Sequence, residues 1–412
     1  MNLQSIIDKK HQAAKYMVKE ITYICKKLPK RDPGSEGEKL ACEYMANVLK
    51  KDCGCDRVEV EAFEENPGSF YGWIYLTVGL GLVAIPLLYL APVVSLVLLL
   101  IGLAIALLQF GMYKKTVDAL FPKKTGHNVT AFKKPTGEVK RRIIFNGHPD
   151  ATWEWPMNYH FGYVGFDLHI ISSFLGLFYF IGIAIAAIAA NGAVGAMDIG
   201  TLLGKFALGG LVFVPLWIGM FFMWNQKRIV DGANDNLSGC YMGIALLKLL
   251  KDEGIELENT ELGVVLTGSE EAGLRGAKAW SAKHKNDFND VPTFIYSYDT
   301  IHDPKYLAVN YRDLNATVKA DKDVSDLFME AAKELGIFCE AGLVPPFGGA
   351  TDSAAFCQEG LRATGVTGLN HKIEDYYHTR RDTYDNMNEE GLAGCFAVTA
   401  KTLEMFDNGA KQ

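Results

Sequence analysis

The chain has 412 residues, of which 49% are hydrophobic, and a formal net charge of -7 at pH 7. Its basic residues form no stripe that would follow a phosphate backbone, so the charge argues against a nucleic-acid-binding protein. Apart from two pairs of apolar segments, the sequence contains no internal repeat and no low-complexity stretch, and its length suits one α/β domain with additional segments.

The first predicted elements are a helix and a pair of strands. Ser35-Glu-Gly-Glu38 has the form of a capping box, which predicts a helix from Glu38 to Lys51. Residues 57–63 alternate between polar and apolar side chains, as an edge strand does. We expect residues 127–132 to pair with this strand.

A long apolar block follows the first of these strands. No charged residue lies between Glu65 and Lys114, and residues 73–112 are long enough for two spans of roughly 20 residues each. The block is interrupted near Pro86 and Pro92, where a helix would be expected to break. Buried core helices of a soluble protein are the alternative, but such helices seldom exceed roughly 18 residues without a charge. We therefore predict a transmembrane hairpin.

A second apolar block, with stretches at 170–190 and 206–224, predicts another hairpin and brings the expected number of transmembrane helices to four. An even number of spans returns the chain to the side on which it entered the membrane, so the separated polar parts are able to fold together. The predicted division is one globular domain in three parts and two transmembrane hairpins: 1–70, 114–165 and 226–412 for the domain, 71–113 and 166–225 for the hairpins.

Basic residues near the spans predict the orientation of the globular domain. Only Lys205 lies on the far turns, whereas several basic residues lie on the side of the domain: Lys114, Lys115, Lys123, Lys124, Lys227 and Arg228. The positive-inside rule then places the domain in the cytoplasm. Eight cysteines fit a reducing compartment if they are unpaired.

Residue types that bind metals follow the expected strands of the globular domain. Three β-rich runs lead to them: 141–147 to His148, 262–267 to Glu270 and Glu271, and 293–298 to Asp299. Asp235 instead lies on a Gly/Asn-rich turn that opens an apolar helix at 239–250, where a carboxylate meets the positive end of the helix dipole. Because an open α/β sheet binds its ligands beyond the carboxyl ends of its strands, we expect these residues to converge.

The residue types suit zinc, which binds imidazole nitrogen and carboxylate oxygen. Two Zn²⁺ ions carry four positive charges, which Asp235, Glu271, Asp299 and one hydroxide would neutralise. Two closely spaced metals need a carboxylate between them, and we assign Asp235 to this position.

Two acidic residues are then free for other roles. Adjacent side chains point in different directions, so Glu271 is expected to bind metal while Glu270 faces the reacting water as general base. Asp150 follows His148 by two residues and is expected to accept a hydrogen bond from the second imidazole nitrogen.

These motifs resemble those of the di-zinc metallopeptidases that include leucyl aminopeptidases and glutamate carboxypeptidase. The matching segments are His148-Pro-Asp150, Gly232-Ala-Asn-Asp-Asn-Leu-Ser-Gly239, Glu270-Glu-Ala-Gly-Leu-Arg-Gly276, Asp299 and His378-Thr-Arg-Arg-Asp-Thr383. Many members have Asp where this chain has Asn234, a change that removes no expected ligand. The segment 348–356 is similar to one that backs the cleft in this family.

The resemblance implies a three-layer α/β/α zinc-exopeptidase fold with a mixed central sheet, here carrying four inserted transmembrane helices. It also implies that His148 and Asp299 hold one zinc ion and Glu271 and His378 the other, with Asp235 between them. Asp303 and His371 are the competing candidates for Asp299 and His378.

The activity expected from the resemblance is a membrane-bound, two-zinc exopeptidase, most simply an aminopeptidase on short peptides. The alternatives are a carboxypeptidase or an amidohydrolase of N-acyl amino acids, with Arg312, Arg380 or Arg381 as carboxylate clamps. A non-catalytic membrane scaffold is the alternative of another class, but it predicts lost ligands, and here all are present. A glutaminyl cyclase is less expected, because it would use a single zinc.

Overall fold

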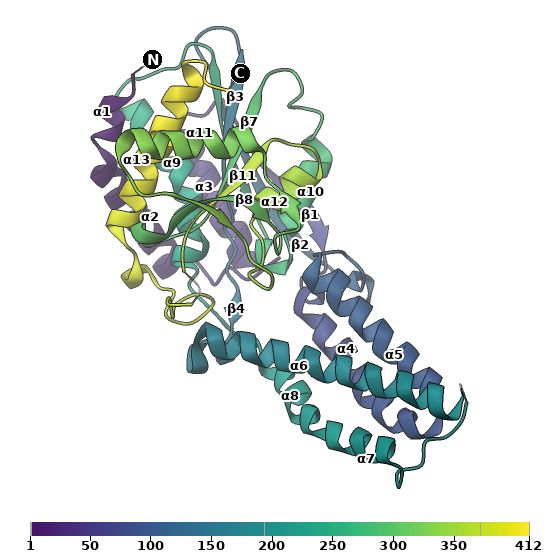
Figure 1. The fold of residues 1–412 in the computed structure, drawn as a ribbon. Helices are drawn as coiled ribbons and strands as arrows, with labels where there is room; N and C mark the ends of the chain where they lie inside the picture. The colour runs from purple at the N-terminus through teal and green to yellow at the C-terminus, as the bar shows by residue number, and fades with distance from the viewer. Residues whose placement is uncertain (1, 193, 371, 412) are drawn as a thin grey trace. The chain divides into compact units, whose positions relative to one another are not determined.

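The computed structural model describes residues 2–192, 194–370 and 372–411, and the chain divides into two compact units. The first consists of Met1–Pro67, Lys123–Trp153 and Lys227–Gln412, and the second of Gly68–Pro122 and Glu154–Gln226. The chain passes between the units through β4 (Trp153–Glu154) and β5 (Asn225–Ile229). Figure 1 shows the elements of each unit.

A mixed sheet forms the centre of the first unit, as the sequence predicts. Within the described residues it has nine strands in the order β1-β2-β6-β3-β7-β11-β8-β10, and β9 pairs with β8. The strands are β1 (Arg57–Glu65), β2 (Lys124–Lys133), β3 (Arg141–Gly147), β6 (Thr260–Thr267), β7 (Thr293–Ile301), β8 (Leu307–Asp313), β9 (Val318–Lys319), β10 (Glu340–Leu343) and β11 (Ala363–Gly368).

The predicted pairing of the first two strands is confirmed, and the structure shows that it is antiparallel, with Arg57 opposite Phe132. β3 lies between β6 and β7 and is parallel to both, so the carboxyl ends of these three strands meet at one edge. The prediction for β7 was slightly wrong, since the strand continues to Ile301 and Asp299 lies inside it. The continuation is stabilised by pairing with β11, where Asp299 is opposite Thr367.

Helices cover both faces of the sheet, which gives three layers (Figure 1). Successive side chains of β3 point to opposite faces of the sheet. Ile143 and Phe145 belong to the main hydrophobic core, whereas Ile144 faces the other side. Helices α9, α3, α11 and α13 pack on the side of the main core, α2 packs against α9 and α13, and α10 and α12 pack on the other side. The helices are α1 (Gln4–Ile7), α2 (Lys10–Lys27), α3 (Glu36–Lys51), α9 (Ser238–Asp252), α10 (Arg275–His284), α11 (Lys322–Leu335), α12 (Asp352–Gln358) and α13 (Glu389–Asp407).

The predicted capping box at the start of α3 forms only in part. The Ser35 hydroxyl accepts a hydrogen bond from the backbone N–H of Glu38 at 3.1 Å, as expected of an N-cap. The Glu38 carboxylate instead turns into the interior, where it accepts hydrogen bonds from the backbone N–H groups of Gly34 and His127. Glu38 is therefore part of the buried interior and not a surface capping residue.

The second unit is built from apolar helices. Within the described residues, four are long and apolar enough to cross a membrane: Ser69–Leu90, Pro92–Gly111, Pro156–Asn191 and Leu202–Phe222. The second combines α5 (Pro92–Ile105) with a π-helical turn, the fourth combines α7 (Leu202–Gly209) and α8 (Val214–Gly219) with short 3-10 turns, and the first and third are α4 and α6. Helix α6 changes direction at Gly162, which has a φ of 68°.

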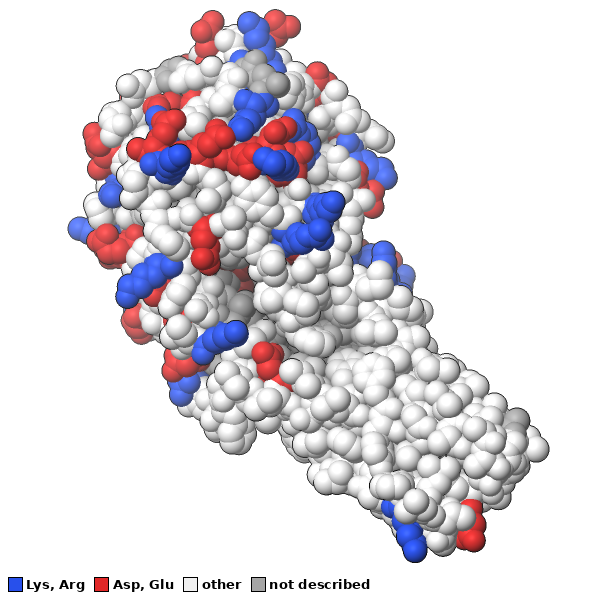
Figure 2. Space-filling model, viewed as in Figure 1, with Lys and Arg blue, Asp and Glu red and all other residues white. Residues whose placement is uncertain are grey.

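Large apolar side chains cover the outside of this unit, and charged residues are sparse on the face shown in Figure 2. The exposed side chains include Val83, Leu90, Leu168, Leu175, Val212 and Phe222. Inside the unit, helices meet through aromatic rings and few polar contacts. The Trp217 indole N–H donates to the carbonyl of Ser173 at 2.9 Å, and Trp155 stacks on Phe166. Apolar side chains face outward, as on helices whose solvent is lipid.

Candidate metal centre

The residues predicted to bind metal come together at the carboxyl edge of β3, β6 and β7. His148 follows β3 directly, and Glu270 and Glu271 lie on a 3-10 turn that follows β6. Asp235 comes from the turn before α9, and His378 from the loop before α13. Five separate parts of the chain, counting Asp299 in β7, therefore supply one buried group of side chains.

His148, Glu270 and Asp299 form a first cluster, with one ligand atom of each within 4.8 Å of the others. The Nε2 atom of His148 lies 3.8 Å from Oε2 of Glu270 and 3.9 Å from Oδ2 of Asp299. The imidazole nitrogen thus points towards two carboxylates. Glu270 lies in this cluster, so geometry alone would permit it to be a metal ligand as well as a base.

Asp235, Glu271 and His378 form a second cluster with the same spacing. The Nε2 atom of His378 lies 3.0 Å from Oδ2 of Asp235 and 3.3 Å from Oε1 of Glu271. The other oxygen of Asp235, Oδ1, lies 3.4 Å from Nε2 of His148 in the first cluster. The two carboxylate oxygens of Asp235 therefore face different clusters.

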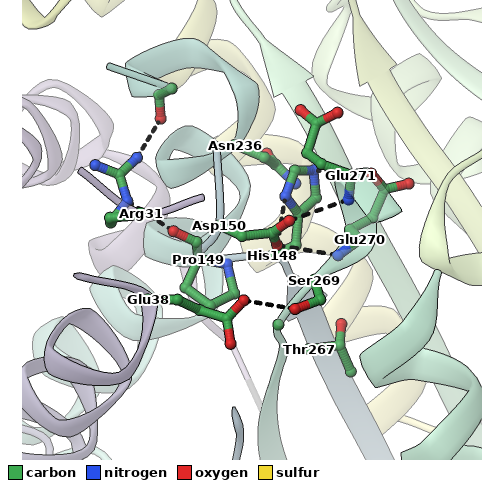
Figure 3. A network of polar contacts seen from close by, with 12 residues as sticks. Arg31, Glu38, His148, Pro149, Asp150, Asn236, Thr267, Ser269, Glu270 and Glu271 are labelled. Carbon is green, nitrogen blue, oxygen red and sulfur yellow. Dashed lines mark hydrogen bonds and ion pairs between the residues drawn. The ribbon is translucent and has the colours of Figure 1, made fainter. Parts of the chain in front are cut away.

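Asp150 supports both the histidine and the acidic turn (Figure 3). Its Oδ1 lies 3.3 Å from Nδ1 of His148, on the ring side away from the carboxylates. Its two oxygens also accept hydrogen bonds from the backbone N–H groups of Glu270 and Glu271, at 3.1 and 3.0 Å. The second function was not predicted, because only the fold brings the end of β3 next to the turn after β6.

Asp382 is a further residue of the site to which the sequence led us to assign no role, although it belongs to the quoted His378 motif. Its carboxylate accepts hydrogen bonds from the backbone N–H and side-chain amide of Asn234 at 2.8 and 2.9 Å, and from the backbone N–H of Asp235 at 3.1 Å. An aspartate at position 234 would place a second carboxylate against Asp382, whereas the amide of Asn234 donates to it. Asp382 follows His378 by four residues in the same motif, and this spacing was the signal by which the sequence could have indicated a role for Asp382.

Burial and mutual repulsion raise the proton affinity of the site. Burial and the charge of Asp235 raise the pKa of Asp299 to about 8. Burial opposes the charging of His378, but the nearby carboxylates of Glu271 and Asp235 outweigh it and raise its pKa to about 10. A buried group of carboxylates is stable only if protons or cations compensate its charge.

Several polar atoms of the site are buried without a hydrogen-bond partner, among them Nε2 of His148, Oδ2 of Asp235 and Oε1 of Glu271. Buried polar atoms are normally satisfied, so such a group needs an explanation. In this site imidazole nitrogens face carboxylate oxygens at short range; for example, Nε2 of His378 lies 3.0 Å from Oδ2 of Asp235. Both atom types are common ligands of divalent metal ions such as zinc. The residues of this site therefore fit bound metal.

A cavity of about 90 Å³ lies beside Asp299. One part of its wall is apolar and another carries amide and hydroxyl groups: Leu343, Val344, Pro345, Leu369 and Tyr377, and Asn310, Thr351 and Thr367. Thr351 belongs to the segment 348–356 that the sequence associated with the cleft. The neighbouring Asp352 is buried and accepts a hydrogen bond from the hydroxyl of Thr267, at the end of β6.

The two competing candidates do not enter the site in the part of the chain that the structure describes. Asp303 belongs to neither cluster, and its carboxylate accepts a hydrogen bond from the backbone N–H of Lys305, as the cap of a short 3-10 turn. His371 lies outside the described residues.

Comparison with protein families supports the chemistry that these residues suggest. Residues 221–403 match the model of Peptidase family M28. This match covers the segment that carries Asp235, Glu270, Glu271, Asp299 and His378. The protein is a metallopeptidase, a hydrolase. Over residues 221–403 the chain is similar to peptidase family M28, and the resemblance found in the sequence motifs is confirmed.

Solved structures share the fold at low sequence identity. An aminopeptidase from Aneurinibacillus sp. strain AM-1 matches with a TM-score of 0.55 and 15% identity over 95% of this chain and 93% of that one. A zinc aminopeptidase from Bacillus subtilis matches with a TM-score of 0.56 and 12% identity over 95% of both chains. A glutaminyl cyclase from an Acidobacteriales bacterium matches with a TM-score of 0.53 and 13% identity over 97% and 95%. No curated protein matches the sequence. The fold is thus common to peptidases and cyclases and does not separate them.

Proposed function

We propose that the protein is a membrane-bound exopeptidase with two zinc ions, acting as an aminopeptidase on short peptides. The observation that carries this proposal is the pair of buried clusters that share Asp235. His148 and Asp299 would hold one ion, Glu271 and His378 the other, and Asp235 would lie between them with one oxygen towards each. When bound, the ions would polarise the scissile carbonyl and make a water molecule more acidic.

Glu270 is the proposed general base. Burial raises its pKa well above the ordinary value of a glutamate, which suits a group that takes up and later releases a proton near neutral pH. The Glu270 carboxylate would accept a proton from the attacking water and donate it to the leaving amine, so that the enzyme is unchanged after each turnover. Asp150 would hold the His148 imidazole and the backbone of the acidic turn in place.

The role of Glu270 is tested by Glu270→Gln, with Glu271→Gln as the matched variant on the neighbouring residue. We expect Glu270→Gln to keep both zinc ions and to lose turnover by several orders of magnitude, whereas Glu271→Gln should lose zinc. Zinc per protein, measured by elemental analysis beside peptide turnover, separates the two. Unchanged activity in Glu270→Gln would exclude it as the base, and loss of zinc would make it a ligand.

The cavity beside Asp299 supports a pocket for the side chain of the residue that is cleaved. Its mixed wall suits a small or medium-sized apolar side chain, in keeping with an aminopeptidase on apolar peptides.

One feature favours a second candidate, a carboxypeptidase or an amidohydrolase of N-acyl amino acids. A cavity of about 450 Å³ is lined by four basic residues, Lys30, Lys227, Arg228 and Arg380, and by the carboxylate of Asp231, which pairs with Lys30. Arg380 lies only two residues after His378. Such a basic wall suits a free carboxylate. Matched peptides that are acetylated at the amino end or amidated at the carboxyl end distinguish the candidates. An aminopeptidase cleaves only the amidated peptide, a carboxypeptidase or N-acyl hydrolase only the acetylated one, and a scaffold cleaves neither.

We further propose that the four apolar helices cross a membrane and that the catalytic unit is cytoplasmic. The proposal is supported by helix length and composition and by the bias of basic residues around the spans. Ile199, in the turn between α6 and α7, and Phe338, in the first unit, are both exposed. Ile199→Cys should react with a membrane-impermeant maleimide on intact cells and Phe338→Cys only after permeabilisation. The reverse pattern would invert the orientation.

A further inference from the structure

Two buried glutamates meet at a single serine hydroxyl next to the proposed catalytic turn. The Ser269 hydroxyl lies 2.6 Å from Oε2 of Glu38 and 2.5 Å from Oε1 of Glu65. All three side chains are buried, and Figure 3 shows a dashed line between the Ser269 hydroxyl and the Glu38 carboxylate. Glu38 comes from α3, Glu65 from the last residue of β1, and Ser269 from the loop that precedes Glu270.

Counting hydrogens shows that this group holds one extra proton. A serine hydroxyl has one hydrogen and donates it to one oxygen only. Both contacts have the short distance of a hydrogen bond between oxygens, so the second contact needs a hydrogen that a carboxyl group supplies. One of the two glutamates is therefore protonated.

The backbone around the pair identifies the protonated member. Each oxygen of Glu38 accepts a backbone N–H, Oε1 from His127 at 2.9 Å and Oε2 from Gly34 at 3.1 Å, which is the pattern of an ionised carboxylate. Oε2 of Glu65 is buried and without a hydrogen-bond partner. Burial raises the pKa of both carboxyl groups, that of Glu38 well above its ordinary value and that of Glu65 to about 7, so the hydrogen-bond pattern and not the pKa distinguishes them. Glu65 thus donates to Ser269, and Ser269 donates to Glu38.

Ser269 occupies a position where this chain of hydrogen bonds fixes the backbone. It has a φ of 55°, in the left-handed region, and the next two residues are Glu270 and Glu271. Asp150 holds these two residues by their backbone N–H groups, and the pair of glutamates holds Ser269 by its side chain. The acidic turn is therefore attached to the interior at three successive residues.

We propose that Ser269, held between an ionised Glu38 and a protonated Glu65, is a positioning residue for the turn that carries the general base and a zinc ligand. This inference rests on the proposed function for the roles of Glu270 and Glu271. Glu38, Glu65 and Ser269 all belong to the first unit.

The proposal predicts an asymmetry between the two glutamates. Gln at position 65 keeps a neutral donor for Ser269, so Glu65→Gln should retain kcat within about twofold, whereas Glu65→Met has no donor and should lower it. Gln at position 38 presents an NH2 group to one of two backbone N–H donors, so Glu38→Gln should be damaging. Glu38→Gln, Glu65→Met and Ser269→Ala should each lower kcat or zinc affinity by about 10- to 100-fold, with little change in KM, as residues that support metal ligands do.

The full-length protein in detergent is assayed for kcat, KM, zinc affinity by chelator competition, and Tm. Ser281→Ala and Glu20→Gln remove comparable buried hydrogen-bonding groups elsewhere in the first unit and serve as controls for loss of stability alone. Equal damage from Glu65→Gln and Glu65→Met, or a harmless Glu38→Gln, would overturn the assignment. A Ser269→Ala protein that changes only in Tm, as the controls do, would overturn the positioning role. Zinc affinity is measured without turnover, so a wrong peptidase assignment would leave this test intact.

Discussion

The two units of the molecule use the same side chains in opposite ways. In the first unit, apolar residues form most of the core and most charged residues lie on the surface, but four carboxylates and two histidines, all buried apart from the half-buried Asp299, gather at the candidate metal centre. In the second unit, large apolar residues such as Leu168 and Val212 lie on the outside, and the interior contacts are made by glycines, aromatic rings and a few hydroxyls.

This difference in burial fits the proposed membrane location of the second unit. Water makes the exposure of apolar surface costly at about 25 cal/mol per Å², whereas lipid does not distinguish apolar side chains inside a helical unit from those outside it. The first unit contains a group of carboxylates and histidines whose charge needs to be compensated by cations or protons. The second unit contains few charged side chains, and we expect its stability to depend on close packing of its helices.

The largest expected effect comes from removing the carboxylate that lies between the two histidines. Asp235→Ala should lose zinc and lower turnover by at least roughly three orders of magnitude, because both clusters lose an oxygen that faces them. Zinc per protein and peptide turnover are measured on the same sample. The variant Asp252→Ala, at an exposed position, is a control, and retention of both ions in Asp235→Ala would contradict the shared position.

A charge on the outside of the second unit tests the comparison most directly. Leu175 is exposed on α6, and Leu175→Arg should reduce membrane insertion at a cost of about 2.5–3.5 kcal/mol if that surface faces lipid. Phe338→Arg, at a similarly exposed position of the first unit, should have no such effect. The membrane-bound fraction of each variant is measured by sedimentation. Equal behaviour of the two variants would mean that both units meet water.

Packing inside the second unit is tested by two neighbouring glycines of α4. A Cβ atom at Gly81 would lie 2.8 Å from the Trp217 ring, whereas one at Gly79 would meet nothing within 4 Å. Gly81→Ala should destabilise the unit by about 1–3 kcal/mol, and Gly79→Ala should be neutral or slightly stabilising because alanine favours helix. Thermal unfolding in detergent, followed by circular dichroism, measures both. An unchanged thermal unfolding of Gly81→Ala would show that the helices are not closely packed at this contact.

The titratable groups of the candidate metal centre predict that zinc affinity depends on pH. Without metal, the raised pKa values of Asp299, about 8, and His378, about 10, mean that both groups are protonated at neutral pH and must lose a proton to bind zinc. Zinc affinity should therefore rise with pH, by about tenfold per pH unit for each proton released. Chelator competition across neutral pH measures it. An affinity that is flat with pH would show that these groups are already deprotonated.

Much of the catalytic unit was predictable because its signals are local. A few neighbouring residues are enough to recognise each of these features: the alternation in β1, the apolar runs in β3 and β6, and the motifs around His148 and Glu270. The apolar hairpins were equally clear from the absence of charge between Glu65 and Lys114.

Contacts made across the fold were not predictable in this way. Glu38 was interpreted as a capping residue because its spacing from Ser35 fits that motif, but its carboxylate is used 231 positions away at Ser269. Asp382 and the second role of Asp150 were missed for the same reason. A hydrogen bond leaves no periodic pattern in the sequence when its two partners belong to distant segments.

The sequence by itself determined the candidate metal-binding residues, the strands that lead to them, and the segments that form long apolar helices. These properties follow from side-chain chemistry and from the period of the local backbone. Only the tertiary structure decided that Asp235 faces both clusters, that Asp150 holds the acidic turn, and that one hydroxyl joins Glu38 to Glu65. Such decisions depend on distances between segments, and those distances exist only once the sheet has assembled and the core has closed around it.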